Sequence, residues 1–189
     1  RYNLANKLIT PGSVVLDAAC GYGYGTFILK RKAAHATGID RDIDSIRLCQ
    51  KRLISGGISN IDFLVADVLN LPFSDDSFDS VVGMEMIEHI NEPQRFLSEA
   101  YRVLRPKGSI MISTPYGNNT LLPDGTPFSQ YHIREYTQEE IEEMLFNSGF
   151  EIQQTYGQYI ILGALMKLTR NKVKPVSNIK AGSVQSVME

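Results

Sequence analysis

One short segment constrains the fold of this chain more than any other. Residues 13–18, with the sequence SVVLDA, form an apolar run that ends with an acid and a small residue, and Gly21, Gly23 and Gly25 follow it. An apolar run of this length bounded by turn residues is typical of a buried strand. The glycines permit positive φ angles and a close approach of the backbone to a ligand. The segment therefore predicts a strand followed by a ligand-binding loop or by a tight turn into a helix.

Strands and helices alternate along most of the remaining chain. Capping residues indicate three helix starts, namely Asp42 or Asp44, Asn91 with Gln94, and Thr137 with Glu140. Helices are expected over residues 25–34, 42–54, 92–104 and 137–147. Strands after the first are expected over residues 36–40, 61–67, 78–84 and 108–114. This alternation predicts an α/β fold, a doubly wound Rossmann-like sheet with helices on both faces, whose ligands bind at the carboxyl ends of the strands.

The C-terminal region is predicted to contain the last strands of the domain, followed by a polar tail. Residues 150–156 and 158–165 are interpreted as two final strands, although the second is also compatible with a helix. From Asn171 the chain is polar and carries several lysines, which is typical of a loosely ordered tail. We therefore predict one domain over residues 1–170 and a polar tail over residues 171–189.

The amino-acid composition argues against several classes of function. The 189 residues carry a net charge of −2, so no overall positive field attracts a nucleic acid. No apolar run approaches the roughly 20 residues of a membrane span. Cys20 and Cys49 show neither a disulfide framework nor a metal-ligand spacing, which favours a reducing, cytoplasmic environment. The chain begins at Arg1 without a methionine, so a fragment of a longer protein is one interpretation.

Three acids stand at the ends of three successive predicted strands: Asp17, Asp40 and Asp67. Asp17 would repel a pyrophosphate, and Thr26 stands where a dinucleotide-binding loop needs its third glycine. Asp40 can accept hydrogen bonds from both hydroxyls of a ribose, and Asp67 can accept one from the amino group of an adenine. Together the acids predict a nucleoside pocket without a phosphate clamp, which points to S-adenosylmethionine.

Four motifs resemble those of the class I S-adenosylmethionine-dependent methyltransferases in order and spacing. They are VLDAACGYGYG, GIDRD, ADVLNLPFSDDSFDSVVGMEMIEHI and YRVLRPKGSIMISTP, and the resemblance extends from about Val14 to Phe150. It implies a seven-stranded sheet whose last strand is antiparallel, and methyl transfer as the activity. By the same resemblance the cofactor is expected to contact Asp17, Ala19, Gly21, Gly23, Asp40, Arg41, Asp67, Val68 and Glu85.

The resemblance also implies a role for the main members of this set. Asp40 is expected to hold the ribose, and Asp67 the amino group of the adenine. Val68 is expected to offer its backbone N–H to the adenine ring. The methionine part of the cofactor is expected to lie against Ala19, Gly21 and Gly23.

A second candidate site follows the fourth predicted strand, in the segment MEMIEHINEP. Glu85, Glu88 and His89 lie at spacings of three and four residues, so they would share one face of a helical turn. With the later His132, they resemble the metal-binding set of small-RNA 2′-O-methyltransferases, and ubiquinone-pathway O-methyltransferases carry a partly similar segment. The resemblance implies a site for Mg²⁺ or Mn²⁺ formed by Glu85, Glu88, His89 and His132.

The same residues also admit a reaction without a metal. A hydroxyl acceptor must lose its proton, and His89 is the candidate general base, with Glu85 as its catalytic neighbour. Glu85 can alternatively contact only the cofactor or a backbone amide, and His132 can serve only as a cap of the helix that follows. The residues from Asn91 to Pro93 are interpreted as a helix start without a chemical role.

Three functions are compatible with these features. The first is O-methylation of a small polar acceptor such as a sugar or a secondary metabolite, because the STPYGN…HIREYT block resembles bacterial sugar- and lipid-pathway methyltransferases. The second is a Mg²⁺- or Mn²⁺-dependent RNA 2′-O-methyltransferase, which the Glu–His set favours and the net charge opposes. The third is a non-catalytic S-adenosylmethionine-binding protein.

Overall fold

The computed structural model describes residues 1–116, 122, 124–157 and 164–170, the last range as backbone only. Its strands are β1 (Val14–Ala18), β2 (His35–Asp40), β3 (Ile61–Val65), β4 (Phe78–Met84), β5 (Leu104–Thr114), β6 (Phe150–Gly157) and β7 (Ala164–Arg170). Its helices are α1 (Tyr2–Leu8), α2 (Tyr24–Leu29), α3 (Ile43–Gly56), the short 3₁₀ helix η1 (Ile87–His89), α4 (Pro93–Val103) and α6 (Gln138–Asn147).

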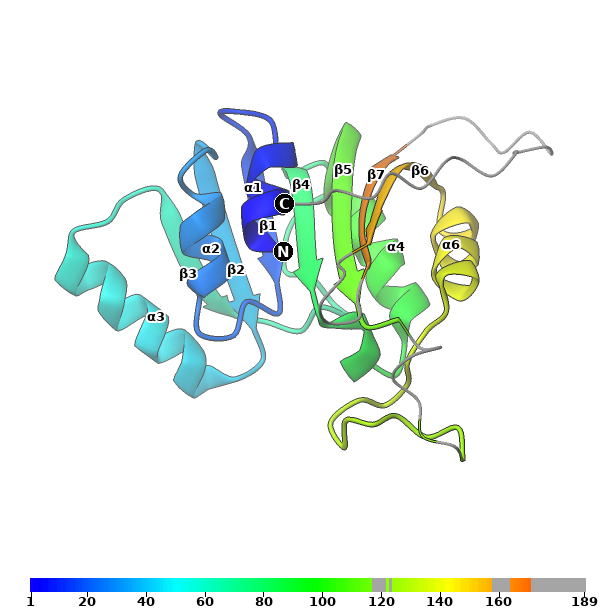
Figure 1. Cartoon of the computed structure of the whole chain (residues 1–189). Helices are drawn as coiled ribbons and strands as arrows, with labels where there is room; N and C mark the ends of the chain where they lie inside the picture. The colour runs from blue at the N-terminus through cyan, green and yellow to red at the C-terminus, as the bar shows by residue number, and fades with distance from the viewer. Residues whose placement is uncertain (117–121, 123, 158–163, 171–189) are drawn as a thin grey trace.

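These strands form one sheet in the order β3-β2-β1-β4-β5-β7-β6 (Figure 1). β1 pairs in parallel with both β2 and β4, and parallel pairing continues to β3 on one side and to β5 on the other. β7 runs antiparallel between β5 and β6. The predicted α/β fold with a parallel sheet is confirmed. The strand order reverses between β1 and β4, and doubly wound sheets bind their ligands at such a switch point.

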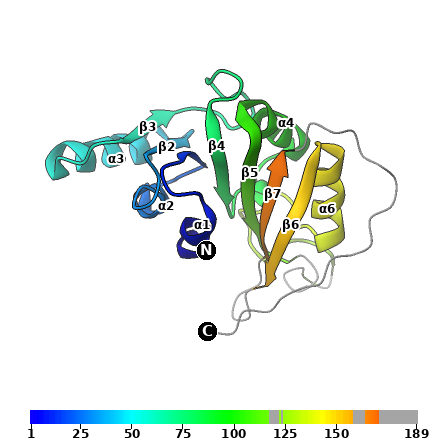
Figure 2. The same cartoon turned by 90° about the horizontal axis from the view of Figure 1, so that it is seen from above.

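Helices cover both faces of the sheet, as Figure 2 shows from above. Successive residues of a strand point to opposite faces, so β1 contributes to two cores. Val15 packs in one core with Ala5 of α1 and Leu29 of α2. Leu16 belongs to the other core, with Phe96 of α4 and Leu145 of α6. α1 and α2 therefore cover one face, and α4 and α6 cover the other.

Two of the predicted helix starts are confirmed. Thr137 Oγ1 accepts a hydrogen bond from the N–H of Glu140 at 3.2 Å, and the Glu140 carboxylate accepts one from the N–H of Thr137 at 2.9 Å. At the start of α3, the Asp42 carboxylate accepts hydrogen bonds from the N–H groups of Asp44 and Ser45. These caps satisfy N–H groups that the first turn of a helix leaves without partners.

The start of α4 differs from the prediction. No Asn91–Gln94 capping box forms, because the N-cap residue is Glu92, and its side chain makes no capping hydrogen bond. Pro93 occupies the first helical position, where its missing N–H leaves one donor fewer to satisfy. The predicted capping box was therefore wrong, and Asn91 lines the cavity described below.

Several element bounds also differ. α2 ends at Leu29 instead of residue 34, and α1 was not predicted at all. β5 begins at Leu104 instead of residue 108, because Leu104 already pairs with Phe78 ahead of an irregularity in the ladder. β7 overlaps the predicted strand 158–165 at residues 164 and 165 and continues to Arg170, while residues 158–163 lie outside the described ranges.

Two further expectations concern the tail and the membrane. The predicted tail, residues 171–189, lies outside the part of the chain that the structure describes. Among the helices that it does describe, none combines the length and the apolar character needed to cross a membrane.

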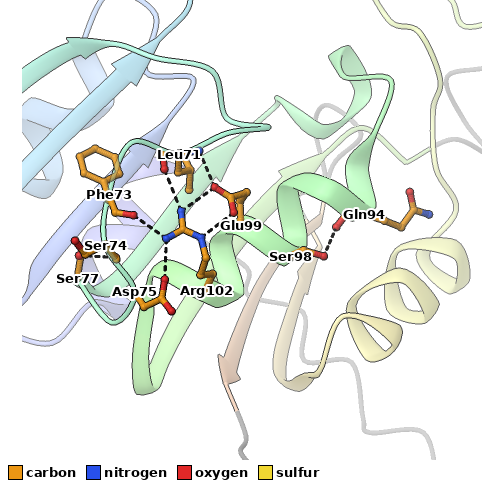
Figure 3. A network of polar contacts seen from close by, with 9 residues as sticks. All are labelled: Leu71, Phe73, Ser74, Asp75, Ser77, Gln94, Ser98, Glu99 and Arg102. Atoms are coloured by element: carbon orange, nitrogen blue, oxygen red, sulfur yellow. Dashed lines mark hydrogen bonds and ion pairs between the residues drawn. The ribbon is translucent and has the colours of Figure 1, made fainter.

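The connection from β3 to β4 is fixed to α4 by Arg102 (Figure 3). All five N–H donors of its guanidinium form hydrogen bonds: two to Glu99, one to Asp75 and two to carbonyl oxygens of the connection, at 2.7–3.0 Å. Glu99 also accepts a hydrogen bond from the N–H of Leu71 at 2.7 Å. Because the Arg102 guanidinium bonds to it, the pKa of Glu99 is lowered. An ionic clamp therefore fixes this irregular segment to the C-terminal half of α4.

Candidate functional site

The glycine loop after β1 contains two left-handed glycines. Gly21 and Gly23 have φ angles of 51° and 74°, which favour glycine. A Cβ at Gly21 would meet no atom within 4 Å, whereas one at Gly23 would lie 2.7 Å from the ring of Phe63 and 2.8 Å from Cys49 Sγ. The side-chain position of Gly21 therefore faces open space, and Gly23 lets the loop pack against β3 and α3.

Asp40, at the end of β2, holds this loop in place. One of its carboxylate oxygens accepts a hydrogen bond from the N–H of Gly21 at 2.8 Å, and the other accepts one from the N–H of Asp42 at 2.9 Å. A carboxylate offers about four lone-pair positions, so two remain for a ligand. The residue predicted to bind the ribose is thus oriented by the backbone around it.

A cavity of about 310 Å³ opens beside Asp40 at the carboxyl ends of the parallel strands. Its lining includes Met86, His89 and Asn91 after β4, and Ile133 from the segment before α6. The lining also contains six of the nine residues predicted to bind the cofactor: Ala19, Asp40, Arg41, Asp67, Val68 and Glu85. The other three, Asp17, Gly21 and Gly23, are not among its lining residues.

Asp17 lies beneath the loop and is fully buried. Its carboxylate accepts hydrogen bonds from the hydroxyl of Tyr2 at 2.9 Å and from that of Thr26 at 2.6 Å. Burial raises the pKa of Asp17 to about 7, although the Thr26 and Tyr2 hydrogen bonds act in the opposite direction. In this structure Asp17 therefore anchors α1 and α2 under the cavity.

Glu85, the first residue after β4, has a left-handed backbone with a φ angle of 50°, which is uncommon for a residue other than glycine. Its N–H donates to the carbonyl oxygen of Ser113 at 2.9 Å, and the Ser113 hydroxyl donates to Glu85 Oε1 at 2.8 Å. Glu85 Oε2 forms an ion pair with the guanidinium of Arg1 at 3.1 Å. Glu85 is thus held by β5 and by the N-terminal residue.

A second cavity, of about 260 Å³, shares Glu85 with the first. Arg1 and Tyr2, Tyr24 of α2 and Met84 at the end of β4 contribute to its lining. Neither Arg1 nor Tyr2 was predicted as a site residue, because no motif in the sequence indicates that the N-terminal segment packs against the glycine loop.

Glu88, His89 and His132 form a cluster that shares His89 with the lining of the larger cavity. Each offers one metal-ligand atom, and these atoms lie within 4.8 Å of one another. Glu88 is fully buried, and neither of its carboxylate oxygens has a hydrogen-bond partner among the described residues. The hydroxyl of Thr114 acts to lower the pKa of Glu88, although it too is buried without a hydrogen-bond partner among the described residues. Burial raises the pKa of Glu88 to about 7.

The two imidazole rings of this cluster are oriented by acceptors behind them. His89 Nδ1 lies 2.8 Å from the carbonyl oxygen of Tyr131, and His132 Nδ1 lies 2.9 Å from Glu135 Oε1. A carbonyl oxygen can only accept, so His89 Nδ1 carries the proton. The carboxylate of Glu135 assigns the same tautomer to His132. In the neutral form of each ring, Nε2 is then an unprotonated nitrogen.

The structure therefore assembles three of the four residues predicted as a metal set. The segment before α6 docks on η1, where the N–H of Ile133 donates to the carbonyl oxygen of Glu88 at 2.8 Å. Glu85 is not part of this group, and its carboxylate contacts Ser113 and Arg1 instead. His132 does not cap α6, because Thr137 does so. Glu135 was missed, although an acid three residues after His132 was a visible signal.

Comparisons with known proteins agree with this geometry. A family model described as a methyltransferase domain matches residues 9–175. A probable S-adenosylmethionine-dependent methyltransferase of Mycolicibacterium smegmatis is 35% identical over 150 residues, which cover 78% of this chain and 56% of the relative. The phthiotriol/phenolphthiotriol dimycocerosates methyltransferase 1 of Mycobacterium ulcerans is 35% identical over 154 residues, with coverage of 78% and 56%.

Solved structures show the same fold at low identity. A putative methyltransferase of Bacillus halodurans has a TM-score of 0.75 at 17% identity, covering 92% of this chain and 97% of the other. The [4+2]-cyclase SpnF has a TM-score of 0.77 at 19% identity, with coverage of 89% and 81%. This chain spans about half the length of the curated relatives it matches. By its family match and these relatives, the chain belongs to the class I S-adenosylmethionine-dependent methyltransferase superfamily.

Proposed function

We propose that this domain transfers a methyl group from S-adenosylmethionine to a hydroxyl oxygen of a small polar acceptor, such as a sugar or a secondary metabolite. One observation carries the proposal: Asp40, Asp67 and His89 line the same cavity at the switch point of the sheet. The two acids supply acceptors for a nucleoside, and the imidazole supplies an acceptor for the proton of a hydroxyl.

The lining residues fit the adenosine part of the cofactor. Asp40 keeps two lone-pair positions for the ribose hydroxyls. Asp67, oriented by a hydrogen bond from the N–H of Leu69 at 2.9 Å, can accept from the adenine amino group. Val68 is 8% exposed and adds apolar surface beside it. When bound, S-adenosylmethionine supplies an electrophilic methyl group, so the protein has to orient the acceptor and take up its proton.

We assign His89 as the base that takes up the proton of the acceptor hydroxyl. Its Nε2 is the unprotonated nitrogen in the tautomer that the Tyr131 carbonyl selects, and a positioned imidazole contributes about 10²- to 10⁴-fold to such a reaction. Glu85 forms hydrogen bonds and an ion pair with Ser113 and Arg1. We therefore assign Glu85 to cofactor binding and not to proton transfer.

Glu88, His89 and His132 also fit a divalent cation. The Glu88 carboxylate is buried without a partner, and histidines that bind metals usually donate their other ring N–H to a carboxylate or a carbonyl, as both do here. Two imidazole nitrogens and one carboxylate suit Mn²⁺ better than Mg²⁺, which prefers oxygen ligands. A bound cation would lower the pKa of the acceptor hydroxyl.

Chelation and two substitutions distinguish a metal-dependent reaction from one in which His89 acts without a metal. If Mn²⁺ participates, EDTA lowers methyl transfer, and Glu88→Gln weakens Mn²⁺ binding by at least about tenfold, as measured by titration of the metal-free protein. If His89 acts alone, EDTA has no effect and only His89→Gln abolishes transfer. Glu92→Gln is the matched control, because Glu92 is exposed and forms a long ion pair with Arg95 at 3.8 Å.

A lipophilic hydroxylated acceptor is the second candidate. The Mycobacterium ulcerans relative is named for phthiotriol and phenolphthiotriol dimycocerosates. In this chain the side chain of Ile133 lines the cavity while 52% exposed, and Tyr131 beside it is 74% exposed. Exposed apolar groups at a cavity mouth offer surface to an apolar acceptor.

Acceptor profiling tests the proposed function. Calorimetry is expected to show S-adenosylmethionine binding, and a labelled methyl group is expected to appear on small hydroxylated molecules. Label on lipophilic alcohols or on a small RNA instead would replace the proposed acceptor class. Binding without transfer to any of the three would support the non-catalytic alternative. Absence of binding would refute the proposal.

A further inference from the structure

We propose that the turn over residues 128–133 docks on a lipid layer, from which the protein takes up a lipophilic acceptor. The docking surface consists of Phe128, Tyr131 and Ile133 and is called the apolar rim below. The inference rests on the proposed function, because it states where an acceptor of the second, lipophilic class comes from. It concerns the outer surface of the domain and adds no contact to the cofactor.

Three large apolar side chains are exposed on this one turn. Phe128 is 78% exposed, Tyr131 74% and Ile133 52%. The N–H of His132 donates to the carbonyl oxygen of Ser129 at 3.1 Å, which closes a β-turn. Phe128 and Ile133 flank that turn, and Tyr131 lies within it. Single exposed apolar side chains are common on protein surfaces, whereas a group of them marks a surface that binds lipid or another apolar partner.

The backbone of the apolar rim is held against the candidate site. The carbonyl oxygen of Tyr131 lies 2.8 Å from His89 Nδ1. The N–H of Ile133 donates to the carbonyl oxygen of Glu88 at 2.8 Å. Tyr136, which follows the rim, is buried in the core. The exposed side chains are therefore presented on a fixed backbone, and their exposure is a property of the fold.

The apolar rim lies at the mouth of the larger cavity. Ile133 lines that cavity together with His89, the proposed base. In Figure 1 the yellow-green segment that carries the rim extends beyond the carboxyl ends of β4 and β5, away from the sheet. The rim is thus placed where a flat surface can reach it. A lipid layer there would bring hydroxylated lipids to the cavity, whereas a folded protein partner would cover the mouth.

The charges beside the rim fit a lipid layer without net charge. Arg134 is the only arginine or lysine of segment 122–136, and it forms an ion pair with Glu140. Glu135 is buried, so Asp124 is the one exposed acid among the described residues of this segment. A polyanion or an anionic lipid would find no basic cluster on this part of the chain. The rim therefore has to bind by burial of its apolar side chains, as interfacial segments do.

Binding to vesicles of phosphatidylcholine, which carries no net charge, tests the proposal. The whole chain, without cofactor or acceptor, is expected to sediment with these vesicles at low and at high salt. Phe128→Ser is expected to weaken binding by about tenfold, as for loss of one buried aromatic side chain. It should leave methyl transfer to a water-soluble acceptor unchanged, because Phe128 is not among the lining residues of either cavity.

Ile54→Ser is the matched control, because Ile54 is 84% exposed on α3, at the other end of the sheet (Figure 1). It should leave vesicle binding unchanged. The chain contains no tryptophan, so Phe128→Trp and Ile54→Trp each place a single fluorophore. Emission from position 128 should shift to shorter wavelength on vesicles and be quenched by brominated lipid. Emission from position 54 should not change.

Three results would overturn the inference. They are absence of binding to vesicles, equal weakening by Phe128→Ser and Ile54→Ser, and binding that requires anionic lipid and disappears at high salt. Dissociation of a wild-type dimer by Phe128→Ser would also contradict it, because a second copy of this chain would then occupy the rim. Failure of the wild type to bind S-adenosylmethionine would instead refute the proposed function and leave the vesicle result unchanged.

Discussion

Replacing Asp40 by alanine is expected to weaken binding of S-adenosylmethionine by about 100-fold. Two effects add: the ribose hydroxyls lose a charged acceptor, and the N–H groups of Gly21 and Asp42 lose the carboxylate that orients the glycine loop. Hydrogen bonds to a charged group contribute about 1.5–3 kcal/mol each, and about 2.7 kcal/mol corresponds to this factor. Isothermal titration calorimetry measures the change directly.

Asp44→Ala is the control for Asp40→Ala. Asp44 stands in the first turn of α3, its side chain is 83% exposed, and it forms an ion pair with Arg47 at 3.4 Å. Its loss should leave the affinity unchanged. Asp40→Asn separates the two effects, because an amide oxygen can still accept from one backbone N–H without the charge. Unchanged cofactor binding by Asp40→Ala would show that Asp40 does not hold the ribose.

Replacing Arg102 by alanine is expected to lower the free energy of unfolding by about 3 kcal/mol, although Arg102 touches neither cavity. The substitution removes five hydrogen bonds and leaves two carbonyl oxygens and the Glu99 carboxylate short of partners. The bond to Asp75 adds little, because that carboxylate is 72% exposed. For a domain of this size the loss corresponds to a melting temperature lower by about 6–12 °C, which thermal denaturation measures.

Two other arginine substitutions serve as controls for the stability loss expected of Arg102→Ala. Arg95→Ala removes an exposed arginine from the same helix, whose ion pair with Glu92 spans 3.8 Å, and should cost less than about 0.5 kcal/mol. Arg102→Lys keeps the charge but loses the planar fork that serves the loop carbonyls and Glu99 together. If Arg102→Lys were as stable as wild type, charge alone would explain the clamp, and the hydrogen-bond count would be irrelevant.

The parts of the fold that depend on local pattern could be predicted from sequence. β1 and β4 are apolar runs bounded by turn residues, and Asp42 and Thr137 form the caps that their spacing indicated. Asn91 was misread because Pro93 can open a helix without a side-chain cap. α1 was missed because its local sequence pattern does not indicate a helix. The role of its apolar residues is apparent only from the core that they contact.

In the candidate site, too, the residues that follow from local pattern could be predicted and the others could not. Asp40, Asp67 and Val68 line one cavity, because the ends of parallel strands meet at one edge of the sheet. Glu85 could not be separated from Glu88 and His89 by spacing alone. Its left-handed backbone turns it toward Ser113 and Arg1, and such a backbone conformation in a residue other than glycine leaves no signature in a single sequence.

Because Tyr2 contacts Gly25, substitutions at these two positions, which lie far apart in the sequence, are expected to depend on each other. A methyl group gained at position 25 would collide with an aromatic ring 2.0 Å away, while a small residue at position 2 would leave a gap above the glycine. Neither change is neutral alone, but the two together restore the packing. Residues 2 and 25 are therefore expected to vary as a pair among homologous chains, so that the first helix and the glycine loop diverge in step.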